Sequence, residues 1–209
     1  MRGPVSEAGL TTPRQDAGVT ASNRQFVIDS LAGRPVVLVG MMGAGKTTVG
    51  RRLASQLGFS FIDSDAEVEK AAGMPITEFF EMHGETEFRA GEARVMARIL
   101  KQGRTVVATG GGILLNPDTR QLIAETAVSV WLKADADLLF ARVSRRDTRP
   151  LLQTQDPRAT LEKLIEERYP IYATADVTVT SRDVPHEQVA ENIIAEIAGH
   201  FHARAAAEK

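Results

Sequence analysis

A glycine-rich segment at residues 40–47 has the pattern G-x-x-x-x-G-K-T, and it limits how this chain can fold more than any other feature. An apolar run at residues 36–39 precedes it, and a helical pattern follows it. A strand that leads into such a loop presents backbone amides, and the positive end of the next helix, to a phosphate group. The lysine reaches the outer phosphates and the final hydroxyl takes a magnesium position. We therefore expect a nucleoside triphosphate site, with a glycine-rich turn that holds no ligand as the alternative.

Short runs of apolar, mostly β-branched residues alternate with helical stretches along the rest of the chain. Strands of this kind are typically buried on both faces, and helices between them impose parallel pairing with right-handed crossovers. The expected fold is α/β, a three-layer α/β/α sandwich with a central five-stranded parallel sheet. The predicted strands are residues 36–39, 61–63, 105–109, 128–132 and 177–180, and the predicted helices are residues 46–57, 64–72, 76–83, 85–101, 117–125, 136–144, 158–169 and 186–201.

The composition narrows the class of protein. The 209 residues are 43% hydrophobic, enough for one domain with a sizeable core. The 25 basic and 27 acidic residues balance, which argues against a dedicated nucleic-acid or membrane-surface binder. The lack of cysteine excludes disulfides and thiolate metal sites and favours a cytoplasmic location. We expect a flexible extension at residues 1–33, without the apolar core of a secretory signal, and a C-terminal tail at residues 203–209.

Polar residues and glycines follow two of the predicted strands, at the edge where such sheets bind ligands. Asp63 and Asp65 end the second strand and could serve a metal ion and a substrate hydroxyl, although a helix cap followed by a first-turn acid explains them equally well. Three glycines at residues 110–112 permit close approach to a ligand, with a flexible turn as the alternative. Arg89 and Glu92 share a helix face, where an exposed salt bridge is the alternative to a functional pair.

Taken together, six segments occur in the order and spacing of one known family. They are residues 40–54, 61–65, 84–92, 110–112, 149–152 and 167–176. From about residue 34 to residue 189 the chain resembles the shikimate kinases, which belong to the nucleoside-monophosphate-kinase branch of phosphate-loop proteins. It departs from the family at residues 144–147, where charged residues replace a stretch that is often rich in glycine.

The resemblance implies transfer of the terminal phosphate of ATP to the 3-hydroxyl of shikimate, with Mg²⁺, on the route to chorismate and the aromatic amino acids. It implies a domain at residues 34–202, with a substrate-binding lobe at residues 65–100 and a lid at residues 145–157. The implied nucleotide contacts are Gly43, Ala44, Gly45, Lys46, Thr47, Thr48, Arg142, Arg149 and Arg182, and the implied metal contacts are Thr47 and Asp63. The implied substrate contacts are Asp65, Arg89, Gly110, Gly111, Gly112 and Arg168, and the implied catalytic residues are Lys46, Asp65 and Arg149.

The implied roles suit the residue types. Guanidinium groups bind a carboxylate bidentately, as Arg89 and Arg168 would in anchoring shikimate. The Asp65 carboxylate can take the proton of the attacking hydroxyl, and Glu92 would orient Arg89. Arg149 would reach the transferring phosphate from the lid as an arginine finger. The resemblance also implies that Arg142 stacks on adenine and that Arg182 lies in the loop that closes over the base.

Two alternatives come from different classes of protein. Gluconate kinase shares the phosphate loop and the general fold, but it would not require the arginine–glutamate pair together with the three glycines. A ligand-sensing regulatory domain of the same fold would be expected to lose Lys46, Asp65 or Arg149, and all three are present. We expect shikimate as the small-molecule partner, no nucleic-acid or membrane partner, and a monomer.

Overall fold

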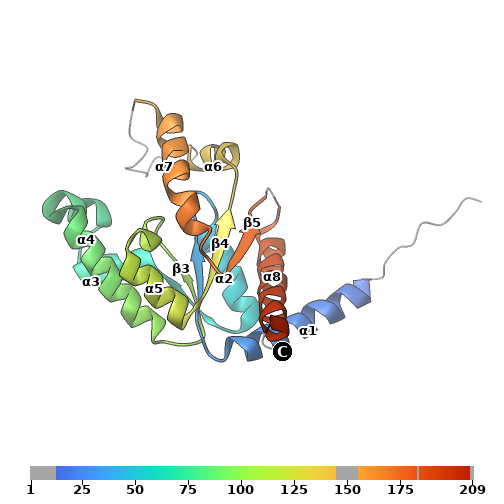
Figure 1. Ribbon diagram of the computed structural model, residues 1–209. Helices are drawn as coiled ribbons and strands as arrows, with labels where there is room; N and C mark the ends of the chain where they lie inside the picture. Colours follow the sequence, from blue (N-terminus) through green and yellow to red (C-terminus); the bar gives the residue numbers. More distant parts are fainter. Residues whose placement is uncertain (1–12, 145–154, 183, 208–209) are drawn as a thin grey trace, which may run out of the picture.

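The computed structural model describes residues 13–144, 155–182 and 184–207 (Figure 1). The predicted arginine finger, Arg149, and most of the predicted lid lie outside these residues. The predicted strands and helices occur in the predicted order, with two additions, the N-terminal helix α1 and a short 3-10 helix, η1. The helices are α1 Pro13–Leu31, α2 Lys46–Leu57, α3 Ser64–Ala72, α4 Ile76–Leu100, η1 Ile113–Leu115, α5 Pro117–Thr126, α6 Ala136–Val143, α7 Pro157–Tyr172 and α8 His186–Ala207.

Five parallel strands form one sheet in the order β2-β3-β1-β4-β5. Helices α2 and α8 pack together on one face, and α4 and α5 pack together on the other (Figure 1). The predicted three-layer α/β/α sandwich is therefore confirmed, and no strand boundary differs from the prediction by more than one residue. The strands are β1 Val36–Val39, β2 Ser60–Asp63, β3 Thr105–Ala108, β4 Val128–Lys133 and β5 Val177–Thr180.

Burial follows the position of a strand in the sheet. Every residue of β1 and β3, in the middle of the sheet, is buried. At one edge, β5 alternates buried valines with exposed threonines, and at the other edge β2 is only partly buried. The expectation that the strands are buried on both faces holds in the middle of the sheet and is wrong at its edges, because the outer strands are not covered on both faces.

Helix α4 contains a break at Gly84, where φ is 77° and ψ is 176°. The break falls between the two helices predicted at residues 76–83 and 85–101, so that prediction is confirmed. It lets Phe80, before the break, pack on Phe88 after it, with ring centroids 4.4 Å apart. Glycine reaches this conformation without steric cost, and the aromatic contact then fixes the angle between the two halves.

The N-terminal part of the chain differs from the prediction. The expected flexible extension contains α1, which packs against α8. Val27 and Leu31 at the end of α1 have no exposed surface, and the Phe26 ring stacks on His202 with centroids 4.2 Å apart. The structure thus has a packed helix within the segment for which a flexible extension was expected. At the other end, α8 continues to Ala207, through most of the predicted tail.

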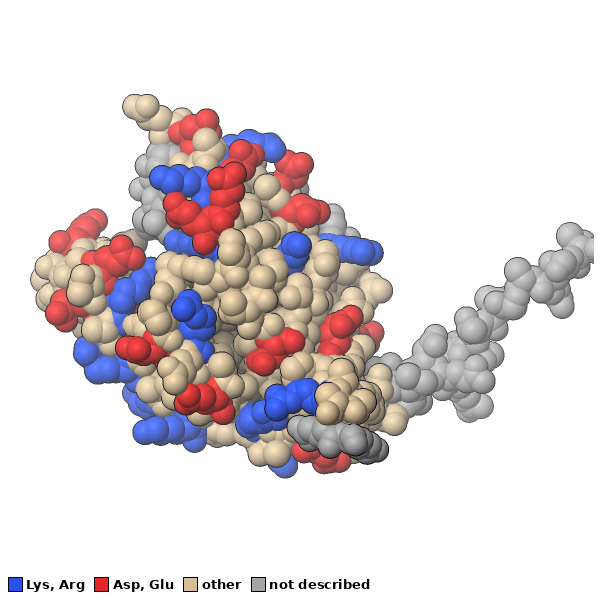
Figure 2. Space-filling model, viewed as in Figure 1, with Lys and Arg blue, Asp and Glu red and all other residues tan. Residues whose placement is uncertain are grey.

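Charged side chains of both signs are interspersed on the face shown in Figure 2, with acidic groups gathered over α7 and at the tip of α4. This distribution fits the balanced count of 25 basic and 27 acidic residues. Among the described helices, none has the length and apolar character that crossing a membrane requires.

Gly50 gives a test of the packing between α2 and the sheet. A Cβ at this position would lie 2.7 Å from Cε2 of Phe61 and 3.1 Å from Cδ1 of Leu38. Overpacking of this kind costs about 1–3 kcal/mol, whereas alanine gains at most about 1 kcal/mol over glycine in a helix. We therefore expect Gly50→Ala to lower the free energy of unfolding in urea by about 1–2 kcal/mol.

Gly199→Ala is the matched control, because Gly199 is exposed on α8 and its Cβ would meet nothing within 4 Å. This variant should be unchanged or more stable by up to about 1 kcal/mol. If Gly50→Ala were stabilised as much as Gly199→Ala, the close packing of α2 on Phe61 and Leu38 would be wrong.

Candidate active site

The predicted phosphate loop connects β1 to α2 at the carboxyl edge of the sheet. Gly40 has a φ of 140°, and a Cβ there would lie 2.7 Å from the carbonyl oxygen of Leu132. Gly45 precedes α2 with a φ of 94°, in the left-handed region. Side chains are strained at such φ values, so the two fixed glycines of the motif give the loop its shape.

Lys46 begins α2 and lies across the loop. Its Nζ donates hydrogen bonds to the carbonyl oxygens of Gly40, at 2.8 Å, and of Met41, at 2.9 Å. The ammonium group is thereby held beside the amides that the loop would offer to a phosphate. Ala44 within the loop is buried, and Thr48 in the first turn of α2 is exposed.

The two predicted metal contacts touch each other. Thr47 Oγ1 donates a 2.9 Å hydrogen bond to Oδ2 of Asp63. The other carboxylate oxygen of Asp63 accepts from the backbone N–H of Asp65 at 3.2 Å and caps α3. The helix-cap alternative is therefore correct for Asp63, but one of its oxygens still faces the phosphate loop. Within the described residues, no three His, Cys, Asp or Glu side chains are grouped to hold a metal ion.

The glycines at residues 110–112 touch the predicted substrate residues. A Cβ at Gly110 would lie 2.6 Å from Oδ1 of Asp65, and a Cβ at Gly112 would lie 2.5 Å from both terminal nitrogens of Arg89. Gly112 has a φ of −103° and a ψ of 0°, values open to other residues. Close approach, and not backbone conformation, therefore requires glycine at this position, and the flexible-turn alternative does not account for the packing.

Arg89 is held by two carboxylates on its own helix. Its Nη1 donates to Glu92 at 2.7 Å, and its Nη2 donates to Glu85 at 3.2 Å. Glu92 is only 3% exposed, so this is not the exposed salt bridge considered as an alternative. Burial raises the pKa of the Glu92 carboxyl above its ordinary value, and the hydrogen bond from Arg89 opposes that shift.

Arg168 reaches the middle glycine from α7 and is 8% exposed. Its Nη1 donates to the carbonyl oxygen of Gly111 at 3.3 Å. The hydroxyl of Tyr172, one turn later on α7, donates to the same carbonyl oxygen. Residues from α3, α4 and α7 thus meet on one segment of three glycines.

The two arginines predicted near the base lie together at the other side of the phosphate loop. Arg142 donates to Oγ of Ser181 at 3.2 Å, to the carbonyl oxygen of Gly43 at 3.4 Å and to the carbonyl oxygen of Arg182 at 3.1 Å. Ser181 in turn donates to the carbonyl oxygen of Ala44 at 3.2 Å. Arg142 and Ser181 therefore join α6, the phosphate loop and the loop after β5.

Three residues of this arrangement were missed at the sequence level. Ser64 is 1% exposed, and its Oγ accepts from the N–H of Gly110 at 3.3 Å, but between two aspartates it has the pattern of a helix start. Ser181 follows an alternation of valine and threonine and carries no signal of its own. Tyr172 lies in one of the matched segments, and that match is the signal that could have indicated it.

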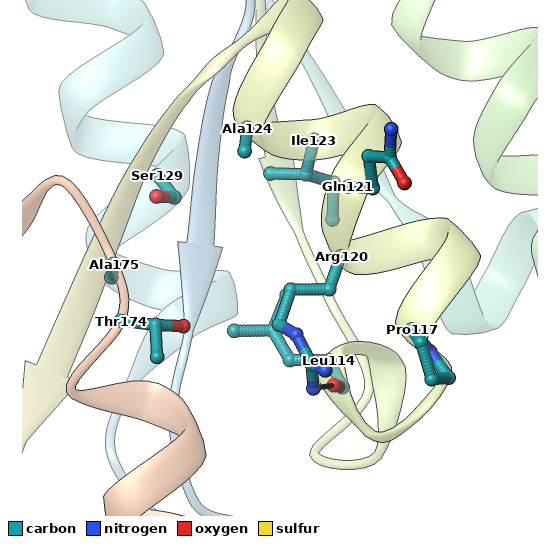
Figure 3. A pocket seen from close by; sticks show the side chains of 9 residues that line it. All are labelled: Leu114, Pro117, Arg120, Gln121, Ile123, Ala124, Ser129, Thr174 and Ala175. Atoms are coloured by element: carbon teal, nitrogen blue, oxygen red, sulfur yellow. Dashed lines mark hydrogen bonds between the residues drawn. The ribbon is translucent and has the colours of Figure 1, made fainter.

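A hollow of about 400 Å³ lies between α5, the start of β4 and the turn after α7. Figure 3 shows Arg120 on its wall, pointing to Leu114 and donating to the Leu114 carbonyl oxygen at 2.8 Å. Among the described residues, none of the predicted substrate or nucleotide contacts lines this hollow. The candidate site is therefore defined by the convergence of functional groups on the phosphate loop and on residues 110–112.

Comparison with known proteins agrees with this arrangement. The shikimate kinase family model matches residues 42–198. A shikimate kinase of Nitrobacter winogradskyi is 59% identical over 174 residues, which cover 83% of this chain and 81% of that protein. One of Rhodopseudomonas palustris is 54% identical over 185 residues, which cover 88% of this chain and 91% of that protein.

The solved structures that resemble this chain also include a shikimate kinase. A shikimate kinase from Acinetobacter baumannii, in complex with shikimate, has a TM-score of 0.78 at 35% identity and covers 83% of this chain and 97% of its own. A gluconokinase from Sinorhizobium meliloti has a TM-score of 0.56 at 19% identity, over 82% of this chain and 97% of its own, and shares the fold alone. The chain belongs to the shikimate kinase family, enzymes that transfer phosphate from ATP to shikimate.

Proposed function

We propose that this chain transfers the terminal phosphate of ATP to the 3-hydroxyl of shikimate, giving shikimate 3-phosphate and ADP, with the residues described above. The observation that carries the proposal is the convergence of Asp65, Arg89 and Arg168 on residues 110–112. Two guanidinium groups and one carboxylate on so small a surface suit a compact acceptor that bears both a carboxylate and hydroxyls.

On the acceptor side, Arg89 and Arg168 bind the shikimate carboxylate. Glu92 holds the Arg89 guanidinium at 2.7 Å, so that less conformational freedom is lost when the substrate binds. Asp65 accepts hydrogen bonds from the ring hydroxyls and takes the proton of the attacking one. The backbone N–H groups of the glycine segment complete the contact with the carboxylate.

On the donor side, Lys46 exchanges its two carbonyl partners for phosphate oxygens of ATP, which are stronger partners because they are charged. The loop residues Gly43, Ala44 and Gly45 contribute amides, and the exposed first turn of α2 with Thr48 faces the same phosphates. Arg142 and Arg182 contact the base. Arg149, which lies outside the described residues, is proposed as the arginine finger on the transferring phosphate.

Mg²⁺ fits the donor set of Thr47 and Asp63, whose oxygens lie 2.9 Å apart. A hydroxyl and a carboxylate are hard oxygen ligands, and Mg²⁺ keeps several waters and uses substrate phosphates for the rest of its shell. When bound, the ion would neutralise charge on the phosphates. Thr47 would contact it directly, and Asp63 would do so through water.

The remaining expectations are part of the proposal. Balanced charge supports the absence of a nucleic-acid partner or a membrane-surface role, and we propose a monomer in the cytoplasm. Gluconate kinase activity is the competing enzymatic function, but the guanidinium pair over the glycines favours shikimate. Lys46 and Asp65 are both present in the sequence, which argues against a purely sensory domain.

The activity itself is tested by ADP release with shikimate, with gluconate and with no acceptor. We expect release that depends on shikimate, that is much slower with gluconate and that stops when EDTA removes Mg²⁺. Equal rates with and without shikimate would identify a plain ATPase and overturn the substrate assignment.

The glycine segment is tested by Gly112→Ala. Its Cβ would lie 2.5 Å from both terminal nitrogens of Arg89, the flexible end of a side chain, so Arg89 should move while the backbone stays. Losing a charged hydrogen-bonding partner costs about 1.5–3 kcal/mol, so calorimetry should show shikimate affinity reduced by about 10- to 100-fold. The stability in urea and the affinity for ATP should change little.

Gly91→Ala is the matched control, because Gly91 lies on the same helix as Arg89 and its Cβ would meet only Nη2 of Arg94, at 3.9 Å. It should leave shikimate affinity unchanged. Normal affinity in both Gly112→Ala and Arg89→Ala would place the carboxylate anchor elsewhere.

Proton transfer is tested by Asp65→Asn, which keeps the shape of the side chain but cannot accept a proton. Turnover should fall by about 100-fold or more, with ATP affinity preserved. Asp118→Asn, at an acidic residue in the first turn of α5, is the control and should retain turnover. Near-normal turnover of Asp65→Asn would leave Asp65 as an acid that only stabilises the start of α3.

A further inference from the structure

Tyr172 belongs to a segment that matches the family, yet none of the roles described so far uses it. It closes α7 and is 1% exposed. A buried hydroxyl that lacks a hydrogen bond is costly, and the Tyr172 hydroxyl meets this requirement with the carbonyl oxygen of Gly111. The Arg168 guanidinium, one turn earlier on the same helix, donates to that oxygen at 3.3 Å. One carbonyl oxygen therefore accepts two donors from α7, as its two lone pairs allow.

The orientation of the Gly111 carbonyl fixes the direction of the Gly112 N–H. The peptide unit is planar and trans, so the carbonyl of Gly111 and the N–H of Gly112 point in opposite directions within one plane. Two hydrogen bonds that hold the carbonyl toward α7 therefore direct the Gly112 N–H away from α7. On the proposed function, that N–H is one of the contacts for the acceptor.

The surroundings of Tyr172 hold its ring in place. Its centroid lies 6.1 Å from that of Trp131 on β4 and 6.3 Å from that of Tyr169 on α7. Its hydroxyl oxygen also lies 3.8 Å from the sulfur of Met41 in the phosphate loop. The hydroxyl therefore sits where α7, the glycine segment and the phosphate loop meet. Burial raises the pKa of Tyr172 to about 12, so it remains a hydrogen-bond donor at neutral pH.

We propose that Tyr172 is a positioning residue for the acceptor: its hydroxyl holds the Gly111 carbonyl and thereby orients both the Gly112 N–H and the Arg168 guanidinium. This inference rests on the proposed function, since it names a further residue behind the same substrate contacts. Tyr172 touches neither reacting group, and its effect should appear in shikimate binding and not in the chemical step.

Tyr172→Phe removes the hydroxyl and keeps the ring. Loss of one neutral hydrogen bond should raise the KM and the Kd for shikimate by about 3- to 10-fold, with kcat and the KM for ATP nearly unchanged. Tyr169→Phe is the matched control, because the Tyr169 hydroxyl donates to the carbonyl oxygen of Ala134 and not to the glycine segment. Its shikimate KM should equal that of the unmodified chain.

The outcomes separate the two proposals. If the unmodified chain shows no shikimate-dependent turnover, the proposed function fails and this inference fails with it. If the unmodified chain is active and Tyr172→Phe keeps a normal shikimate KM and Kd, only the positioning role is overturned. Equal increases in Tyr172→Phe and Tyr169→Phe would also overturn it, because they would indicate a general loss of packing in the aromatic cluster.

A second measurement does not depend on how Tyr172→Phe folds. The chain has two tyrosines, so Tyr169→Phe grown with 3-fluorotyrosine carries a single label, at residue 172. Saturation with shikimate should shift the fluorine resonance, because the ligand binds to the peptide unit that the hydroxyl holds. A resonance that does not move while calorimetry shows bound shikimate would overturn the proposal.

Discussion

The close approach allowed by residues 110–112 is the constraint on which the candidate site depends. A side chain at Gly110 would strike Asp65, and one at Gly112 would strike Arg89. The parallel sheet prepares this contact, because Asp63 at the end of β2 pairs with Ala108 at the end of β3. Residues just beyond the two strands must then share a small volume, and only glycine leaves room there for a carboxylate and a guanidinium group.

Features that depend on neighbouring residues could be predicted from the sequence, whereas contacts between distant residues could not. The phosphate loop is encoded within eight residues, and Gly40 and Gly45 adopt the backbone that its pattern requires. Short apolar strands are equally local signals, and their limits were predicted within one residue. The contact between Tyr172 and Gly111 spans 61 positions in the chain. Periodicity and spacing carry no information about such a contact, and the resemblance supplied the segment without the role.

Helix α1 is a second feature that the local sequence could not predict. Its early residues have the composition of an extension, and Val27 and Leu31, near its end, are buried. Helices in proteins owe most of their stability to tertiary packing, and propensity contributes less. For α1 that packing comes from α8, at the other end of the chain, including the stack of Phe26 on His202. A reading of residues 1–33 by themselves could not reveal a partner so far away in sequence.

The glycine segment and the phosphate loop lie close together, so the acceptor and donor halves of the candidate site are adjacent. A Cβ at Gly111 would lie 3.7 Å from the carbonyl oxygen of Gly40, the same oxygen that accepts from Lys46 at 2.8 Å. Phosphoryl transfer depends mainly on holding two reactants close and in line. On the proposed function, the short distance between the glycine segment and the phosphate loop brings the acceptor close to the phosphates of ATP. Tyr172 contacts both segments from α7: its hydroxyl donates to the carbonyl oxygen of Gly111 and lies close to the sulfur of Met41. On the proposed function, the backbone of the two segments sets how far apart the reactants lie, and the side chains of Arg89, Arg168 and Lys46 bind them there.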